Sequence, residues 1–101
     1  MNELQYDSLT GVYNKKTITE YAKKRIVEEK EKRIVIAILD VDNFKSVNDT
    51  FGHLYGDKVL ARVGGRLKAI VGEDGVIGRI GGADFMIVFN GLDDDQVLRG
   101  M

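Results

Sequence analysis

The sequence of 101 residues contains no cysteine and no proline, and it has a single histidine, His53. The absence of cysteine excludes disulfide bonds and thiolate metal sites, and one histidine cannot form a histidine metal cluster. These absences permit a reducing compartment, and we expect a cytoplasmic protein. Because proline is absent, tight turns must be made by asparagine, aspartate and the 12 glycines.

Long hydrophobic runs and an excess of charge are absent as well. The longest apolar run, Ile34 to Leu39, is far shorter than the ~20 residues that span a bilayer, and the N-terminus does not resemble a signal peptide. Charged residues make up 31% of the chain but nearly cancel to a net charge of -1, which argues against the basic surface that binds nucleic acid. We therefore expect no membrane segment in this chain and no nucleic-acid partner.

The hydrophobic content of 44% is sufficient for one small core, so we expect a single, partial domain over residues 1–101. Asn14 is positioned to cap a first helix, and Gly72 to end a second one. Between them, an Asp-rich turn and a loop are expected through Gly52. The hydrophobic spacing predicts helices over 15–30 and 57–71, strands over 34–39, 76–80 and 84–89, and a short final helix reaching residue 101.

This order of elements predicts an α+β fold of the ferredoxin-like type, with a βαββ core, an N-terminal helix and the final strand missing. The apolar run 34–39 is typical of a central strand that is covered by helices. Gly81 and Gly82 are expected to supply the positive φ angles of a tight hairpin turn between the last two strands.

Two acidic residues, Asp40 and Asp42, follow the apolar run. If the strand alternation continues through them, their carboxylates point to one side and could bind a hard divalent cation together with its phosphates. The alternative is a solvated acidic turn that ends the strand.

Asn48 and Asp57 form a second polar pair. A carboxylate can accept the N1 hydrogen and the exocyclic amine of guanine, and a carboxamide can bind nearby, so the pair could distinguish guanine from adenine. The alternative is that Asp57 caps the second helix and Asn48 closes a turn.

Taken together and in order, these motifs resemble the GGDEF domain of the diguanylate cyclase family. The resemblance covers essentially the whole chain. It rests on the opening motif Asp7 to Lys15, the segment Asp40 to Lys45, Asn48-Asp49, the segment Gly52 to Asp57, and Gly81-Gly82-Ala83-Asp84-Phe85.

The resemblance implies a nucleotide-cyclase-like palm in which two domains, each holding one GTP, meet and form cyclic di-GMP. It implies a homodimer, an adjoining sensor or output domain in a longer parent protein, and Mg²⁺ or Mn²⁺ as the cofactor. By the same resemblance, Asp40 and the Val41 carbonyl would bind the metal, Asn48 and Asp57 would bind guanine, and Phe44 and Lys45 would lie near the ribose and phosphates.

Three features depart from the family. Ala83 stands where the family has an acidic metal ligand, and a methyl group cannot bind magnesium. Asp84 should point to the opposite face of its strand from residue 83, which makes it a poor substitute. The chain is also shorter than the family's domain. In the family's strand order the strand over 34–39 lies between the hairpin and the missing final strand, so we expect it at an edge of the sheet. The family's product-inhibition pattern Arg-x-x-Asp would fall on Gly72 to Gly75, where it is absent.

We therefore expect a catalytically impaired domain that binds a guanine nucleotide or regulates an attached module. One alternative is a piece of an active diguanylate cyclase. The other is a structural remnant that mediates contacts between proteins.

Overall fold

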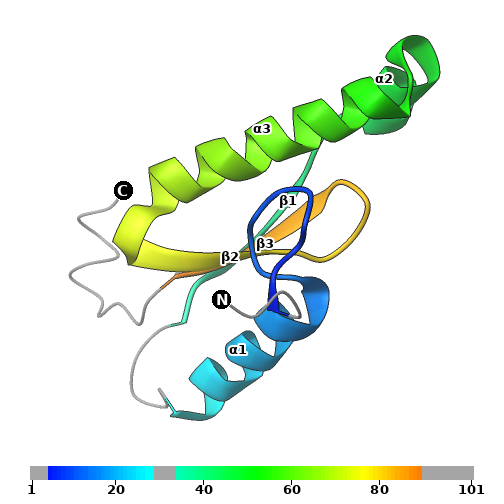
Figure 1. The fold of residues 1–101 in the computed structure, drawn as a ribbon. Helices are drawn as coiled ribbons and strands as arrows, with labels where there is room; N and C mark the ends of the chain where they lie inside the picture. The colour runs from blue at the N-terminus through cyan, green and yellow to red at the C-terminus, as the bar shows by residue number, and fades with distance from the viewer. Residues whose placement is uncertain (1–4, 29–33, 90–101) are drawn as a thin grey trace.

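The computed structural model describes residues 5–28 and 34–89, and Figure 1 shows their arrangement. Among these residues, no helix is long and apolar enough to cross a membrane. The elements are α1 (Lys15–Glu28), β1 (Ile36–Asp40), α2 (Phe44–Phe51), α3 (His53–Val71), the 3-10 turn η2 (Gly72–Asp74), β2 (Gly75–Arg79) and β3 (Asp84–Phe89).

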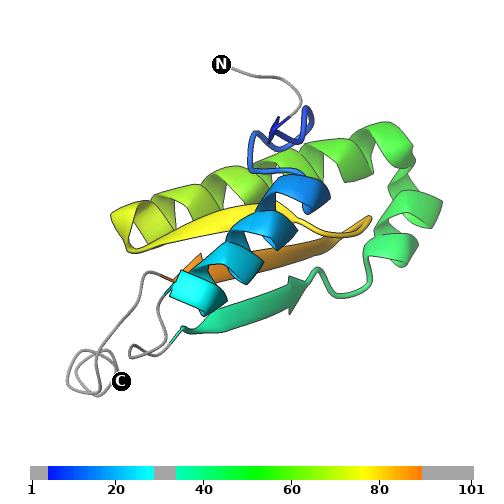
Figure 2. The same ribbon diagram turned by 90° about the horizontal axis from the view of Figure 1, so that it is seen from below.

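The three strands form an antiparallel sheet in the order β1-β3-β2. Helix α3 covers one face of the sheet and α1 covers the other, as Figures 1 and 2 show. Strand β3 alternates between the two faces, since Phe85 and Ile87 are buried under α3 while Val88 is buried under α1. The described residues therefore form a mixed α/β layer structure, as predicted.

Two of the predicted helix ends, the Asn14 cap of the first helix and the Gly72 end of the second, are confirmed. The Asn14 side chain accepts a hydrogen bond from the Thr17 N–H at 2.9 Å and so caps α1. Gly72 ends α3 with a positive φ of 54°, and its N–H donates to the Lys68 carbonyl. A residue with a Cβ would be strained in this conformation.

The loop predicted between Asp40 and Gly52 is wrong, because residues 44–51 form helix α2. Helix α3 also starts at His53, four residues earlier than the predicted start at Asp57. The break between the two helices is Gly52, whose φ is 90°. The short helix was not predicted because its segment contains Ser, Asn, Asp and Thr, whose side chains compete for backbone hydrogen bonds and favour turns over helix interiors.

Among the described residues, β1 lies at an edge of the sheet, as expected from the missing final strand, and it is not the covered central strand that its apolar composition indicated. Four of its five residues are exposed, including Ile38 with 57% of its surface accessible. The apolar composition of the run indicated burial, but the strand order decides how many neighbours a strand has. The short helix predicted to reach residue 101 lies outside the described residues.

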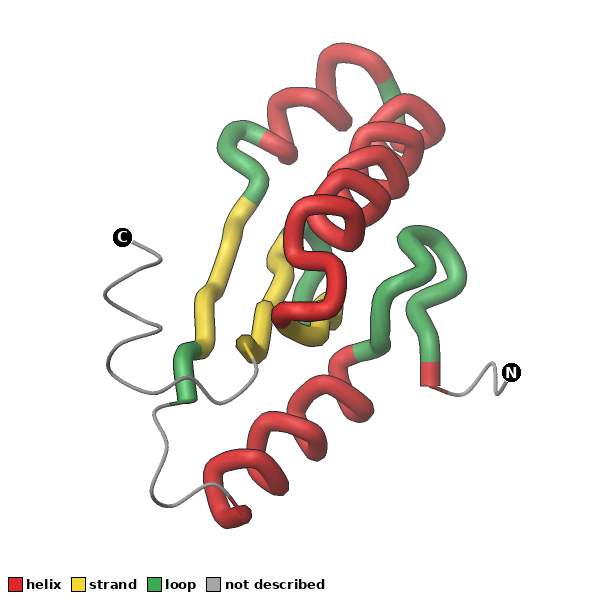
Figure 3. The backbone as a smooth tube through the Cα atoms, turned by 90° about the vertical axis from the view of Figure 1, so that its left-hand side faces the viewer, coloured by secondary structure: helices red, strands yellow, loops and turns green. Residues whose placement is uncertain are grey.

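The opposite edge, along β2, is covered by a segment that we call the N-terminal turn, residues 6–13 (Figure 3). The Tyr13 N–H donates to the Ile77 carbonyl at 3.0 Å, and the Arg79 N–H donates to the Tyr13 carbonyl at 2.9 Å. Thr10 of this turn is buried against α3 at Gly64, where a Cβ would lie 2.8 Å from the Thr10 Cβ. Gly64 is therefore explained by close packing of α3 on the N-terminal turn.

Candidate functional site

The predicted site residues gather at one end of the sheet. The C-terminal end of β1, the hairpin turn between β2 and β3, and helix α2 all lie there, as Figure 2 shows. The site is thus assembled from segments on both sides of α3 in the sequence. The strand register and the packing of α2 on α3 bring them together.

Asp40 and Asp84 are direct partners across the antiparallel pair of β1 and β3. Their carboxyl groups form a hydrogen bond, which together with the repulsion between the two charges raises the pKa of Asp40 above its usual range. A shared proton relieves the repulsion between two such carboxylates, and a divalent cation could do the same. Asp42 lies beyond the end of β1, where strand alternation no longer applies, and it is exposed.

Gly81 lies against the Asp84 side chain. A Cβ on Gly81 would lie 2.9 Å from Asp84 Oδ2, so a larger residue here would displace the carboxylate. Neither Gly81 nor Gly82 has a positive φ, which makes the predicted positive angles of this turn wrong. The turn spans three residues between Ile80 and Asp84, and the Ile80 N–H donates to the Asp84 carbonyl at 2.9 Å. Because of its length, it does not need the φ values of a two-residue hairpin.

Ala83 contributes no polar group to the site. Its methyl group packs against the buried cluster under α3, which includes Phe85. Its carbonyl accepts a hydrogen bond from the Val41 N–H at 3.1 Å. Asp84, by contrast, faces Asp40. The carboxylate that we expected to be a poor substitute for the missing acidic residue at position 83 therefore stands opposite the predicted metal ligand.

Helices α2 and α3 bring together three of the residues predicted to bind the nucleotide. Gly56 is buried, and a Cβ there would collide with Asn48 Oδ1 and lie 3.2 Å from the Phe44 ring. The absence of a side chain at Gly56 therefore lets Phe44 and Asn48 approach α3, next to Asp57. Asn48 Oδ1 is buried, and no residue in the described ranges hydrogen-bonds to it. Unsatisfied buried polar atoms are rare in folded proteins and are typical of groups that await a ligand or a water molecule.

The capping interpretations of these two residues are wrong. Asp57 lies in the second turn of α3 and cannot be its N-cap, and Asn48 lies inside α2 instead of closing a turn. Asp57 and Lys45 are both exposed. No structural role as a cap therefore accounts for Asp57.

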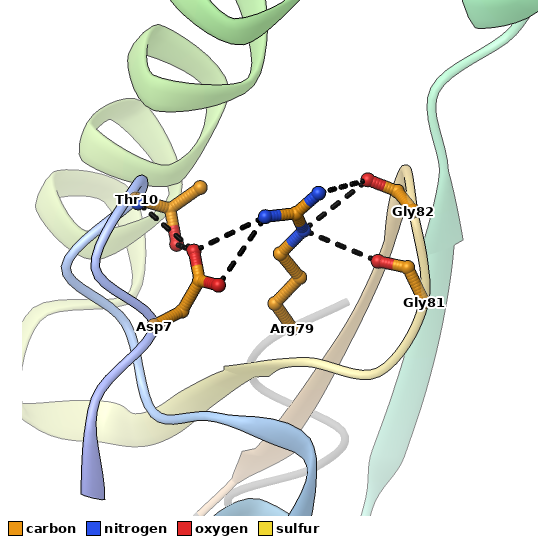
Figure 4. Close-up of polar contacts among 5 residues, drawn as sticks. All are labelled: Asp7, Thr10, Arg79, Gly81 and Gly82. Carbon is orange, nitrogen blue, oxygen red and sulfur yellow. Dashed lines mark hydrogen bonds and ion pairs between the residues drawn. The ribbon is translucent and has the colours of Figure 1, made fainter. Parts of the chain in front are cut away.

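One polar group at the hairpin was missed by the sequence analysis. Arg79 donates from Nη1 to Asp7 Oδ1 at 3.2 Å, from Nη2 to the Gly82 carbonyl at 2.6 Å, and from Nε to the Gly81 carbonyl at 3.2 Å (Figure 4). The signal was present in the sequence, since Arg79 lies two residues before Gly81 and Asp7 opens the N-terminal motif. Nothing in the pattern, however, indicated that these two residues, 72 positions apart in the sequence, are partners.

In the described part of the chain, no group of three or more histidine or acidic side chains could hold a metal ion. Asp40 and Asp84 alone provide two carboxylates. A cation bound here would therefore need further oxygen ligands from the backbone or from a bound phosphate.

The family described as "Diguanylate cyclase, GGDEF domain" matches residues 4–101. Among characterised relatives, diguanylate cyclase DgcP of Escherichia coli K12 is 43% identical over 84 residues, which are 81% of this chain and 25% of DgcP. Probable diguanylate cyclase DgcF of the same strain is 37% identical over 82 residues, covering 81% of this chain and 26% of DgcF. The chain thus spans about a quarter of the length of these relatives.

Solved structures give the same result. The GGDEF domain of DgcB from Caulobacter crescentus, in complex with c-di-GMP, superimposes with a TM-score of 0.85 at 28% identity, over 99% of this chain and 58% of that one. Diguanylate cyclase SiaD from Pseudomonas aeruginosa, in complex with its activator SiaC, has a TM-score of 0.83 at 31% identity, over 93% of this chain and 37% of that one. With a family match over nearly its whole length and the matching fold, this chain belongs to the GGDEF domain family of diguanylate cyclases.

Proposed function

We propose that this chain is a guanine-nucleotide-binding GGDEF domain whose cyclase activity is impaired. The observation that carries the proposal is the hairpin, where Asp84 faces Asp40 while residue 83 offers only a methyl group packed on the core. One half of a cation site is thus retained, and the acidic group that the family places at position 83 is lost.

The residues at the hairpin fit a hard divalent cation such as Mg²⁺ or Mn²⁺. Asp40, Asp84 and the Val41 carbonyl would hold it, and oxygens of a bound phosphate would complete its coordination. A divalent cation supplies charge neutralisation to the phosphates of a nucleotide. The hydrogen-bonded carboxyl pair supports this fit, since two like charges at such close range favour a bound proton or cation.

The residues of α2 and α3 fit a guanine base. Asp57 would accept the N1 and amino hydrogens of guanine, and the Asn48 amide has hydrogen-bonding capacity that the described residues do not use. Phe44 and Lys45 would lie near the ribose and phosphates. Adenine would leave these groups unsatisfied, at a cost of about 1 to 3 kcal/mol.

Calorimetric titration with GTP and MgCl₂, compared with ATP and MgCl₂, tests nucleotide binding. We expect binding of GTP alone, and at least about a tenfold loss of affinity in Asp57→Ala, which follows from the loss of one charge-assisted hydrogen bond. Asp74→Asn is the matched control, because Asp74 is an exposed carboxylate in η2 and belongs to no part of the proposed site. Equal affinity for ATP, or an unchanged Asp57→Ala variant, would rule out guanine recognition.

Catalysis is tested separately by mass spectrometry of reactions that contain GTP and MgCl₂. We expect no cyclic di-GMP from this chain, and none from Ala83→Asp. Residue 83 faces the core under α3, on the opposite side of the hairpin from the Asp40 and Asp84 pair, so one added carboxylate does not complete that pair. Product from the unmodified chain would contradict the proposed impairment.

We also propose that residues 1–101 form part of one domain that acts as a homodimer beside a sensor or output domain in a longer protein. The length of the relatives supports a longer parent, since the matched part is a quarter of DgcP. SiaD in complex with its activator SiaC supports regulation of such domains by a protein partner. A purely structural remnant would bind neither GTP nor the cation, so the titration above separates that alternative.

A further inference from the structure

The Arg79 guanidinium joins two segments that are remote in the sequence. On one side it pairs with Asp7 of the N-terminal turn, and on the other it donates to the carbonyls of Gly81 and Gly82 in the hairpin turn (Figure 4). The Asp7 and Arg79 side chains are each only 20% exposed. A guanidinium with its planar fork of donors can hold a carboxylate and two carbonyls at once, which a lysine ammonium cannot do in the same geometry.

Asp7 is itself held firmly. Its Oδ2 accepts hydrogen bonds from the Thr10 N–H at 2.9 Å and from the Thr10 hydroxyl at 2.7 Å. Thr10 in turn is buried against Gly64 of α3. The carboxylate that orients Arg79 is therefore anchored to the helix and not only to a surface turn.

The hairpin turn that Arg79 holds carries the candidate cation ligands. Gly81 lies directly against the Asp84 carboxylate. A displacement of the turn therefore changes the room available to this carboxylate and with it the position of its oxygens. The Val41 N–H is bonded to the Ala83 carbonyl, so the backbone of Val41 follows the same turn. Two of the three proposed cation ligands are thus connected to the position of the Gly81 and Gly82 carbonyls.

We propose that Arg79 is a positioning residue, held by Asp7, that fixes the hairpin turn and thereby sets the geometry of Asp84 and Val41 opposite Asp40. Through this contact the N-terminal turn is coupled to the cation site. The inference rests on the proposed cation role of Asp40 and Asp84. A change in the segment that carries Asp7 reaches the site through Arg79, without any direct contact with the nucleotide.

The test is residue-resolved amide hydrogen exchange of the ligand-free chain and of the variants Asp7→Asn and Arg79→Lys. The Ile80 amide reports on closure of the turn, since it donates to the Asp84 carbonyl, and the Val41 amide reports on its link to β1. The Phe89 amide, which donates to the Val35 carbonyl at 2.9 Å at the far end of the same sheet, is the internal reference. We expect both variants to accelerate exchange at Ile80 and Val41 about tenfold, with Phe89 unchanged.

Glu28→Gln is the matched control variant, because it removes an ion pair to Lys24 that is exposed and remote from the hairpin. It should change none of the three amides by more than about twofold. Equal acceleration at Ile80, Val41 and Phe89 would mean that the Asp7–Arg79 pair only stabilises the whole fold. No acceleration at any of them would mean that the pair neither positions the hairpin turn nor stabilises the fold. Either result overturns the inference.

A titration with Mn²⁺ separates this inference from the proposed function. If both hold, the unmodified chain binds Mn²⁺, and Asp7→Asn weakens that binding by about fivefold or more, although Asp7 does not touch the proposed ligands. If the unmodified chain binds no Mn²⁺ but the exchange pattern is as expected, the proposed cation site is wrong and the positioning of the turn by Arg79 stands. If Mn²⁺ binds equally to both chains, the coupling to the site is wrong.

Discussion

The two edges of the sheet differ in whether another segment of the described residues covers them. The edge along β2 is covered by the N-terminal turn, which adds backbone hydrogen bonds from Tyr13 to Ile77 and from Arg79 to Tyr13. The edge along β1 has no such partner among the described residues, and its apolar side chains Ile36, Ile38 and Leu39 are exposed. Figure 3 shows the N-terminal turn on one side of the sheet and β1 on the other.

The difference shows where the sheet is fixed and where it remains available. The covered edge connects α1, α3 and the hairpin turn through one short segment, so changes there affect the whole domain. The bare edge offers a row of backbone donors and acceptors and apolar side chains, with no proline or lysine between Ile36 and Leu39 to discourage pairing. The covered edge should therefore respond to substitution by unfolding, and the bare edge by a change in association.

The largest expected effect comes from breaking the covered edge at Gly78. A Cβ there would collide with the Ile18 side chain, which is completely buried between α1 and the sheet, and Gly78 also pairs with Tyr13 of the N-terminal turn. We expect Gly78→Val to lower the free energy of unfolding by about 3 kcal/mol, because a well-packed core cannot accept the added volume. Urea unfolding followed by circular dichroism measures it.

Gly65→Ala is the control for Gly78→Val. Gly65 lies inside α3, and a Cβ there would meet nothing within 4 Å. The substitution should therefore raise stability by about 0.5 to 1 kcal/mol through helix propensity alone. Similar destabilisation by both substitutions would show that glycine chemistry, and not the packing of Ile18 on β2, decides the result.

A smaller effect is expected at Thr10, which anchors the same edge. Thr10→Val keeps the shape of the side chain but removes the 2.7 Å hydrogen bond to Asp7 Oδ2, while the bond from the Thr10 N–H remains. We expect a loss of about 1 to 2 kcal/mol in the free energy of unfolding, as for a partly buried hydrogen bond to a charged group. Thr19→Val, which removes an exposed hydroxyl bond to the Lys15 carbonyl, should change stability by less than about 0.5 kcal/mol. Equal losses would contradict the anchoring role of Thr10.

The elements with a clear period or cap could be predicted from the sequence. Helix α1 with its Asn14 cap, the end of α3 at Gly72 and strand β3 are confirmed, because local hydrogen bonds and alternation determine them. Helix α2 could not be predicted in this way, and the edge position of β1 followed only from the family's strand order with its final strand missing. Eight residues rich in turn-forming types are stabilised as a helix by packing on α3, and strand order depends on partners elsewhere in the chain.

The candidate site likewise contains residues that could be predicted from the sequence and contacts that could not. The motif residues Asp40, Asn48 and Asp57 could be identified through their joint resemblance to the family's motifs, and their roles stay predictions. The pairing of Asp40 with Asp84 follows from the register of β1 on β3, which puts the last residue of one strand opposite the first residue of the other. The Asp7–Arg79 pair depends on how the N-terminal turn packs on α3, and no local pattern encodes that.

The smallest expected effect on stability, and the sharpest test of the bare edge, comes from Ile38→Lys. Ile38 is 57% exposed, so the substitution should change the free energy of unfolding by no more than about 0.5 kcal/mol. We expect the unmodified chain to self-associate by antiparallel pairing of β1 with β1 of a second copy, the simplest contact that satisfies an exposed edge with two-fold symmetry. A lysine in the middle of that strand would repel its counterpart and leave a monomer in sedimentation velocity.

Ile70→Lys is the matched control for that experiment, because Ile70 is 75% exposed on α3 and away from the β1 edge. It should leave association unchanged if pairing of β1 is the cause, and abolish it if general surface hydrophobicity is. Hydrogen exchange of the β1 amides completes the test, since those that do not bond to β3 should be protected only in the associated form. A stable monomer in which all β1 amides are protected would mean that another part of the chain covers this edge, and the contrast between the two edges would then disappear.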